Sequence, residues 1–305
     1  MATPQSGILP EGSPSALFLT LNLASNPGSL DQLRAGLAAI PRLTSDLASL
    51  HGEAGLLSVV GVGSTCWQEL IKLPKPGGLH PFQSLSDGGR SARSTGADLF
   101  VHIRSSRPDL NFQLGNQIVK GMGPSVKVVE EVVGFRYLDN RDLTGFVDGT
   151  ENPEGDDRAR VALVSENDPD FEGGSYIHIQ RYEHLLDEWE KLPVQDQEQV
   201  IGRTKADDVE MEDEAKPPTA HISRVDIRDE QGKKEILRHS MPYGNTQTAG
   251  LYFVSYGATP DAFEAMLAKM IQADPEGHYD HLMDYSKAVT GAAFFAPSLE
   301  FLARL

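Results

Sequence analysis

Residues 145–150 read Gly-Phe-Val-Asp-Gly-Thr and place one carboxylate, Asp148, between apolar neighbours and a glycine. A carboxylate in such surroundings can take up and release a proton during a reaction. An Asp-Gly pair is also a frequent turn, because aspartate caps its own backbone and glycine accepts positive φ. Taken alone, the stretch favours the structural reading, and a catalytic role requires partners elsewhere in the chain.

Two candidate partners lie in the second half of the chain. His221, within Thr-Ala-His-Ile-Ser-Arg, could ligate a metal through an imidazole nitrogen. Arg238, within Ile-Leu-Arg-His-Ser-Met-Pro-Tyr-Gly, could stabilise a developing negative charge. Each also has a plainer reading, since a histidine at the start of a strand is usually structural and an arginine usually forms a surface ion pair. Separately, neither residue identifies a function.

Together and in this order, the three segments resemble the dye-decolourising peroxidase family, whose GxxDG signature matches at Gly145, Asp148 and Gly149. Further runs resemble the compact bacterial B-type branch of that family, within the chlorite dismutase-like superfamily: residues 5–10, 201–205 and 241–244. The resemblance covers nearly the whole chain. It implies a haem peroxidase that reduces hydrogen peroxide and oxidises dyes, phenols or other small reductants through a ferryl intermediate.

The resemblance also implies roles around a b-type haem (iron protoporphyrin IX). His221 is expected to be the proximal iron ligand, with Asp284 accepting a hydrogen bond from its other ring nitrogen; an exposed helical acid is the alternative for Asp284. Asp148 and Arg238 are expected on the opposite haem face, where they would move the peroxide proton and stabilise charge as the O–O bond breaks. Because a carboxylate is a weaker base than imidazole, we predict an acidic pH optimum.

Four further residues are candidates for the haem pocket. Arg203 could pair with a haem propionate, because guanidinium binds carboxylate bidentately, although a surface ion pair explains it nearly as well. Ser240 stands where many B-type relatives carry asparagine, and its hydroxyl could still contact distal water or peroxide. Leu251 and Phe253 occupy alternate positions of a predicted strand, and they could wall the pocket or belong to ordinary core.

Hydrophobic periodicity predicts the elements that position these residues. In the first half these are strands at 15–23, 56–62, 98–103 and 126–137, and helices at 29–48 and 108–119. Pro41 should end or kink the first helix. The order strand, helix, strand, strand, helix, strand is that of the ferredoxin-like unit.

The hydrophobic pattern of the second half predicts a similar series of elements. These are strands at 176–182, 221–227 and 251–256, and helices at 183–202, with a break near Pro193, at 260–273 and at 277–289. We therefore expect an α+β protein of two tandem ferredoxin-like domains, with helices packed on the faces of antiparallel sheets. The domains are predicted at residues 1–145 and 146–305, with haem in the second.

Composition limits the partners of the chain. A formal net charge of −17 disfavours binding to nucleic acid and to anionic membranes. Much of the acidity lies at 207–214, which we interpret as a solvated loop.

Cys66 is the only cysteine, which excludes an intrachain disulfide and fits a reducing compartment. Without a signal peptide or an apolar run of about 20 residues, a cytoplasmic protein is predicted. The resemblance also implies that the protein forms a homo-oligomer, either a dimer or a larger assembly.

Two other functions stay open from the sequence. The same fold and the same His221 ligand could serve a haem- or porphyrin-handling protein that acts in storage, transfer or iron release, and a haem-free regulatory module is the third reading. A carrier has no need of an acid–base group beside a cation on the vacant side of the iron. Asp148 and Arg238 therefore favour the peroxidase.

Overall fold

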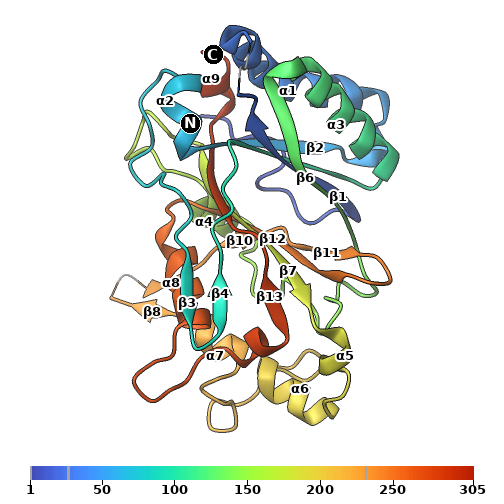
Figure 1. Cartoon of the computed structure of the whole chain (residues 1–305), viewed down its shortest axis with the longest axis vertical. Coiled ribbons are helices and arrows are strands. Elements are labelled where there is room, and N and C mark those ends of the chain that lie inside the picture. The colour runs from blue at the N-terminus through green and yellow to red at the C-terminus, as the bar shows by residue number, and fades with distance from the viewer. Residues whose placement is uncertain (1, 26–27, 231) are drawn as a thin grey trace.

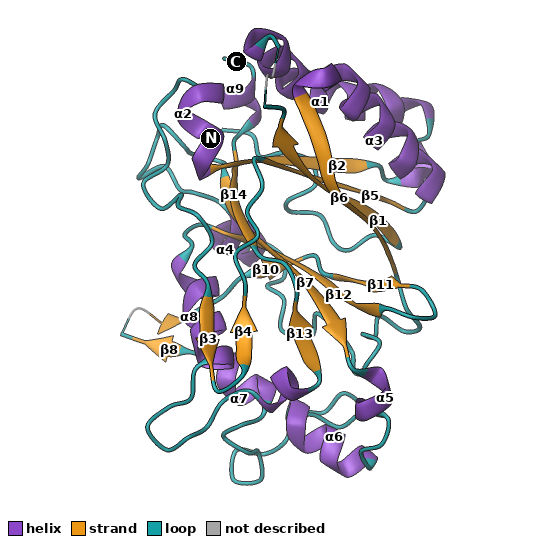
Figure 2. Ribbon diagram, in the orientation of Figure 1, coloured by secondary structure: helices purple, strands orange, loops and turns teal. Residues whose placement is uncertain are grey.

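The computed structural model describes residues 2–25, 28–230 and 232–305. These residues form a mixed α/β fold around a large, mostly antiparallel sheet that closes into a barrel, with helices packed outside it (Figures 1 and 2). Both termini lie at one end of the molecule, where the backbone N–H of Thr3 donates to the Glu300 carboxylate. No helix in the described part of the chain has both the length and the apolar character needed to cross a membrane.

The first half of the chain contributes six strands, three α-helices and two short 3₁₀ helices among the described residues. In chain order they are β1 (Ser15–Leu23), α1 (Leu30–Leu50), η1 (Gly52–Ala54), β2 (Leu57–Gly63), α2 (Ser64–Leu70), β3 (Leu85–Asp87), β4 (Arg90–Ala92), β5 (Leu99–Ser105), α3 (Pro108–Met122), η2 (Gly123–Ser125) and β6 (Val126–Phe135). Four of the strands lie in the order β6-β1-β5-β2. Helices α1 and α3 cover the outer face of this sheet (Figure 2).

Helix α1 shows how the apolar pattern produces this packing. Ser29 caps its start by accepting a hydrogen bond from the Gln32 N–H, and the apolar residues at helical spacing are buried against the sheet. The helix continues through Pro41 to Leu50, so Pro41 does not end it, and a kink at this residue stays a prediction. Buried side chains on both sides of the proline, including Ile40 and Leu47, offset the hydrogen bond that proline cannot donate.

The second half supplies the remaining elements. They are α4 (Asp157–Ala162), β7 (Ser175–His184), α5 (Leu186–Trp189), α6 (Val194–Ile201), α7 (His221–Val225), β8 (Arg228–Asp229), β9 (Gly232–Lys233), β10 (Leu237–Arg238), β11 (Met241–Gly244), β12 (Ala249–Gly257), α8 (Asp261–Ile271), η3 (His281–Asp284), β13 (Ser286–Ala288), β14 (Ala292–Ala296) and α9 (Leu299–Leu302). Four of the strands lie in the order β11-β12-β7-β14.

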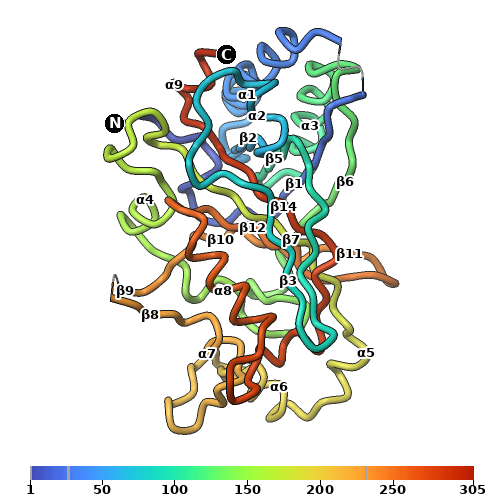
Figure 3. Tube along the Cα trace, turned by 60° about the vertical axis from the view of Figure 1, so that its left-hand side comes forward, coloured from blue at the N-terminus to red at the C-terminus, as the bar shows by residue number. Residues whose placement is uncertain are grey.

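Strands from the two halves join to close the barrel. Strand β11 pairs with β6, and β14 pairs with β2, which gives the ring β12-β11-β6-β1-β5-β2-β14-β7 of eight strands. Strand β14 also leads the chain back to the first half, where α9 packs beside α1 (Figure 3). The halves are therefore held together by backbone hydrogen bonds as well as by side-chain packing.

Side chains alternate between the two faces of the barrel wall. On β12, Tyr252, Val254 and Tyr256 belong to the core inside the barrel, whereas Leu251 and Phe253 pack with α8 outside it. A hairpin of the first half, β3–β4, also crosses to the second half and packs against α8 and β13 (Figure 1).

Two predicted elements of the second half are wrong. Residues 221–227 were predicted as a strand, but His221 begins the short helix α7, directly after a Pro-Pro-Thr-Ala segment that favours a helix start. Residues 277–289 were predicted as helix, but they form η3 followed by β13. The break near Pro193 is confirmed, because α5 ends before this residue and α6 begins after it.

Candidate active site

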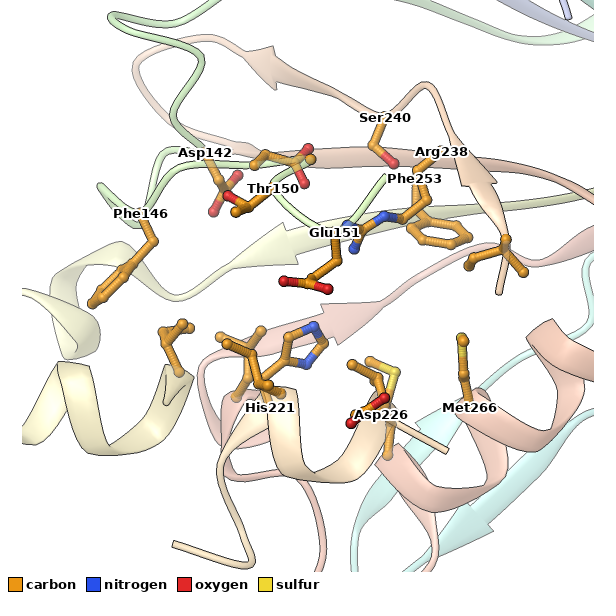
Figure 4. A pocket seen from close by; sticks show the side chains of 18 of the residues that line it. Asp142, Phe146, Thr150, Glu151, His221, Asp226, Arg238, Ser240, Phe253 and Met266 are labelled. Carbon is orange, nitrogen blue, oxygen red and sulfur yellow. The ribbon is translucent and has the colours of Figure 1, made fainter. Parts of the chain in front are cut away.

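A cavity of about 550 Å³ lies between the outer face of β7 and β12 and the helices α7 and α8. This volume is within the range of about 300–1,000 Å³ that is typical of cofactor and ligand sites. The predicted site residues that line it are Asp148, Arg203, His221, Arg238, Ser240, Leu251 and Phe253. Figure 4 shows His221 rising from α7 into the cavity, with Arg238 and Glu151 on the side that faces it.

Asp148 is held in a tight loop between β6 and α4. Its backbone N–H donates to the Asn140 carbonyl at 2.9 Å. Gly145 and Gly149 on either side have φ of +90° and +86°, a backbone conformation that residues other than glycine rarely adopt. A Cβ at Gly145 would also come within 2.5 Å of the Lys205 side chain. The two glycines of the GxxDG signature are thus required by the backbone that presents Asp148.

Arg238 is tied to the same loop through Asn152. The Asn152 amide donates to the Arg238 carbonyl at 2.9 Å, and its oxygen accepts from the Arg238 N–H at 2.9 Å. The Arg238 guanidinium makes no hydrogen bond or ion pair with the residues that the structure describes, and it reaches into the cavity (Figure 4). A free guanidinium in this position can stabilise negative charge on a bound molecule.

The charges around Asp148 oppose one another. Burial raises the pKa of Asp148, Arg238 lowers it, and the nearby Asp142 raises it, with a raised pKa as the net result. Asp148 therefore holds its proton to a higher pH than an ordinary aspartate does. The acid–base transition expected from the sequence therefore moves upward in pH.

His221 bonds to a different acid from the one predicted. Its Nδ1 lies 2.6 Å from Oδ2 of Asp280, which is fully buried and whose other oxygen accepts from the Leu282 N–H. Asp284 is exposed, contacts the Tyr279 hydroxyl and does not line the cavity, so the prediction that it pairs with His221 is wrong. Residues 281–284 form a 3₁₀ helix that Asp280 caps. The capping Asp280 is buried, whereas Asp284 at the other end of the helix is exposed.

Arg203 lies in the cavity wall with an acidic environment of its own. Its Nε donates to Asp208 at 2.8 Å, and its Nη1 lies 3.5 Å from Glu151 and 3.6 Å from Glu210. Nη1 is buried and makes no hydrogen bond within the described structure. Within the acidic run 207–214, which was predicted to be a solvated loop, Asp208 is half-buried against this arginine, whereas Glu210 is exposed.

Comparisons with known proteins agree with this arrangement. The family models described as "Dyp-type peroxidase, N-terminal" and "Dyp-type peroxidase, C-terminal" match residues 5–136 and 139–301. The chain belongs to the Dyp-type peroxidase family. The dye-decolorizing peroxidase of Mycobacterium tuberculosis is 41% identical over 97% of this chain and 88% of its own length. That of Rhodococcus erythropolis is 40% identical over 99% of this chain and 88% of its own.

Solved structures of the family share the whole fold. A Dyp-type peroxidase from Shewanella oneidensis superposes with a TM-score of 0.96 at 44% identity and covers 100% of this chain and 99% of its own. A variant of Rhodococcus jostii DypB, solved in complex with heme, superposes with a TM-score of 0.93 at 40% identity and covers 99% of both chains. The mixed α/β barrel of this Dyp-type peroxidase is therefore a family property.

Three residues of this Dyp-type peroxidase site were not found by sequence reasoning. Asp280 was passed over in favour of Asp284, and Asn152 was not assigned a role. Asp142, which lines the cavity, bonds the His184 Nε2 at 3.1 Å. Burial alone would raise the pKa of Asp142, but His184 and the bonds from Thr144 lower it, so this carboxylate stays charged near Asp148. No sequence pattern marks it.

We expect Asn152→Ala to destabilise the protein by about 1–3 kcal/mol, because two backbone groups of Arg238 lose their partner. Urea unfolding measures the change. Asn152→Asp is the matched control, since it keeps the acceptor for the Arg238 N–H and loses only the donor, and its loss should be smaller. Equal stability of Asn152→Ala and the unmodified protein would contradict the role of this residue.

Proposed function

We propose that the cavity holds a b-type haem between His221 on one side and the Asp148–Arg238 pair on the other, and that this Dyp-type peroxidase reduces hydrogen peroxide there. The observation that carries the proposal is the cavity itself, with a histidine on a buried acid at one wall and a free guanidinium near a carboxylate at the other. The relatives named above are dye-decolorizing peroxidases, and one of the solved neighbours is a heme complex.

The residues that line the cavity fit a haem. Apolar side chains supply a surface for the porphyrin plane: Leu251, Phe253, Met266, Leu267 and Met270. Two buried donors in the lining have no hydrogen-bond acceptor among the described residues, Arg203 Nη1 and Gln180 Nε2. Arg203 Nη1 lies within ion-pair distance of Glu151 and Glu210 but makes no hydrogen bond, and a bound carboxylate would supply an acceptor at hydrogen-bond distance. We assign the haem propionates to the Arg203 side of the cavity.

When bound, the haem would supply the iron that gives electrons to peroxide and then regains them from the reductants. Asp148 takes a proton from hydrogen peroxide at its carboxylate oxygen and returns it to the departing oxygen atom, which leaves as water. Arg238 stabilises the negative charge that develops on the peroxide oxygens. Ser240, beside them in the lining, offers a hydroxyl to the same space.

On the other side, His221 presents Nε2 to the iron while Nδ1 faces Asp280. The carboxylate accepts a hydrogen bond from Nδ1–H, which fixes the imidazole tautomer and gives the ring anionic character. Since Asp280 is fully buried, this hydrogen bond is shielded from water. The alternative of a haem- or porphyrin-handling protein is not favoured, because its function needs no Asp148–Arg238 pair and the relatives are peroxidases.

We further propose that each half is a ferredoxin-like unit, with the boundary between residues 145 and 146. Strand orders support it, because β6-β1-β5-β2 and β14-β7-β12-β11 place the fourth, first, third and second strands of each half in the same sequence. The hairpin β3–β4 and strand β14 join the units.

A homo-oligomer and a cytoplasmic location complete the proposal. Val133 and Phe135 are exposed on one face of β6, which supports burial of that face against another copy. Cys66 is buried and unpaired, which fits a reducing compartment. The expected small partners are hydrogen peroxide and organic reductants, and nucleic acid and membrane surfaces are not expected.

We expect Asp148→Asn and Arg238→Leu each to slow the reaction of haem-loaded protein with peroxide by about 10²–10⁴-fold, because one loses the base and the other the stabilising charge. Stopped-flow recording of the Soret band measures the rate. Asp139→Asn, an exposed acid in the same loop, is the control and should react normally. The mechanism is wrong if both variants keep the unmodified rate.

The same rate should fall as the pH drops through the Asp148 pKa, since the base works only when ionised. Burial raises that pKa above the usual 3.8, so the acid limb lies above pH 3.8. Arg238→Leu should move the limb to higher pH and Asp142→Asn to lower pH, because the two side chains shift the pKa in opposite directions. A limb at the same pH in all three proteins would exclude Asp148 as the titrating group.

Asp280→Asn should make the haem reduction potential more positive, because a neutral acceptor gives the His221 ring less anionic character and so stabilises oxidised iron less. Asp284→Asn is the matched control, as this acid is exposed and outside the cavity. Spectroelectrochemical titration measures both. An equal shift in the two variants would contradict the assignment of Asp280.

A further inference from the structure

The interior of the barrel holds a tyrosine–histidine pair that the proposed reaction does not use. Tyr256 on β12 and His102 on β5 are 0% and 1% exposed, and the Tyr256 hydroxyl lies 2.9 Å from His102 Nδ1. Phe18 stacks on the imidazole with ring centroids 4.8 Å apart. The pair is thus fixed in geometry and removed from solvent.

The protonation states of the two residues follow from their surroundings. Burial raises the pKa of the Tyr256 phenol, which therefore keeps its proton. Burial lowers the pKa of His102, as do Arg104 and His239, so the imidazole is neutral. A neutral imidazole carries one ring proton, and with that proton on Nε2 the phenol O–H donates to Nδ1. His102 is a base placed directly on the tyrosine proton.

Tyr256 also lies close to the wall of the active-site cavity. It follows Phe253, a lining residue, by three positions of β12, which is about 10 Å along the strand. On the neighbouring strand β10, Leu237 is paired with Tyr256 and Arg238 with Ser255. Because electron transfer between redox centres needs no direct contact, Tyr256 can serve a centre bound in that cavity.

A second tyrosine on the same strand provides the contrast. Tyr252 faces the same interior, is 1% exposed, and its hydroxyl has no partner in the described structure. Loss of an electron turns a phenol into a very strong acid, so tyrosine oxidation requires a base that takes the proton at once. Tyr256 has that base in His102, whereas Tyr252 has none.

We propose that Tyr256 is a redox-active residue of this peroxidase. Its phenol gives one electron to the haem centre that peroxide has oxidised, and its proton moves to Nδ1 of His102, which leaves a neutral tyrosyl radical beside an imidazolium. One electron from a reductant, with return of the proton from His102, restores the phenol. This inference rests on the proposed function, which supplies the oxidant, and it assigns one of the two oxidising equivalents to the barrel interior.

Freeze-quench EPR of haem-loaded protein mixed with one equivalent of hydrogen peroxide tests the proposal. The unmodified protein and Tyr252→Phe should both give a tyrosyl radical signal, and Tyr256→Phe should lose it. His102→Phe should also lose the signal, because the proton has no acceptor. Optical spectra of the same samples record the Soret band.

A measurement on the unmodified protein removes dependence on how the variants fold. Among the described tyrosines, Tyr256 is the one whose hydroxyl bonds to a histidine. With ¹⁵N-labelled histidine, pulsed EPR of the radical should therefore show a ¹⁵N coupling and an exchangeable bridging proton. A tyrosyl radical without the ¹⁵N coupling would overturn the proposal.

The outcomes separate this inference from the function on which it rests. A Soret change with no tyrosyl radical in the unmodified protein, or with a radical that persists in Tyr256→Phe, overturns the role of Tyr256 and leaves the peroxidase proposal intact. No Soret change on mixing with peroxide overturns the proposed function, and the role of Tyr256 with it.

Discussion

The pairing of β12 with β7 is the constraint on which both chemical environments of this protein depend. It closes the ring of strands, and side-chain alternation then places Leu251 and Phe253 in the cavity and Tyr252 and Tyr256 inside the barrel. A slip of one residue would exchange these sets. Gly250 helps to fix the register, since a Cβ there would lie 2.0 Å from the Tyr182 carbonyl oxygen.

Hydrogen bonds hold the charged residues around this wall in place. The proposed acid–base group and the guanidinium that assists it come from a loop and a strand that Asn152 joins through two hydrogen bonds. Asp142, which lines the cavity, and the fully buried Asp280 are each paired with a histidine that lines it. His184 and Thr144 hold the pKa of Asp142 low, and the charge on Asp142 in turn raises the pKa of Asp148.

The sequence predicted more of the fold than of the site's fine structure. Regular apolar spacing located α1, α3 and the long strands, because those elements bury one continuous face. The same reasoning misassigned residues 277–289, where a 3₁₀ helix and a three-residue strand are fixed by tertiary contacts. Asp280 and Asp284 have the same charge and differ only in which side of that short helix they occupy. Asn152 could not be recognised, because it bonds a backbone 86 residues away.

The central claim is that a haem lies between His221 and the Asp148–Arg238 pair. A crystal structure of the haem-loaded protein tests it most directly. The account predicts iron bound by His221 Nε2, with Nδ1 on Asp280 and with Asp148 and Arg238 facing the vacant side of the iron. Iron held by any other side chain, or a haem bound outside this cavity, would contradict the account.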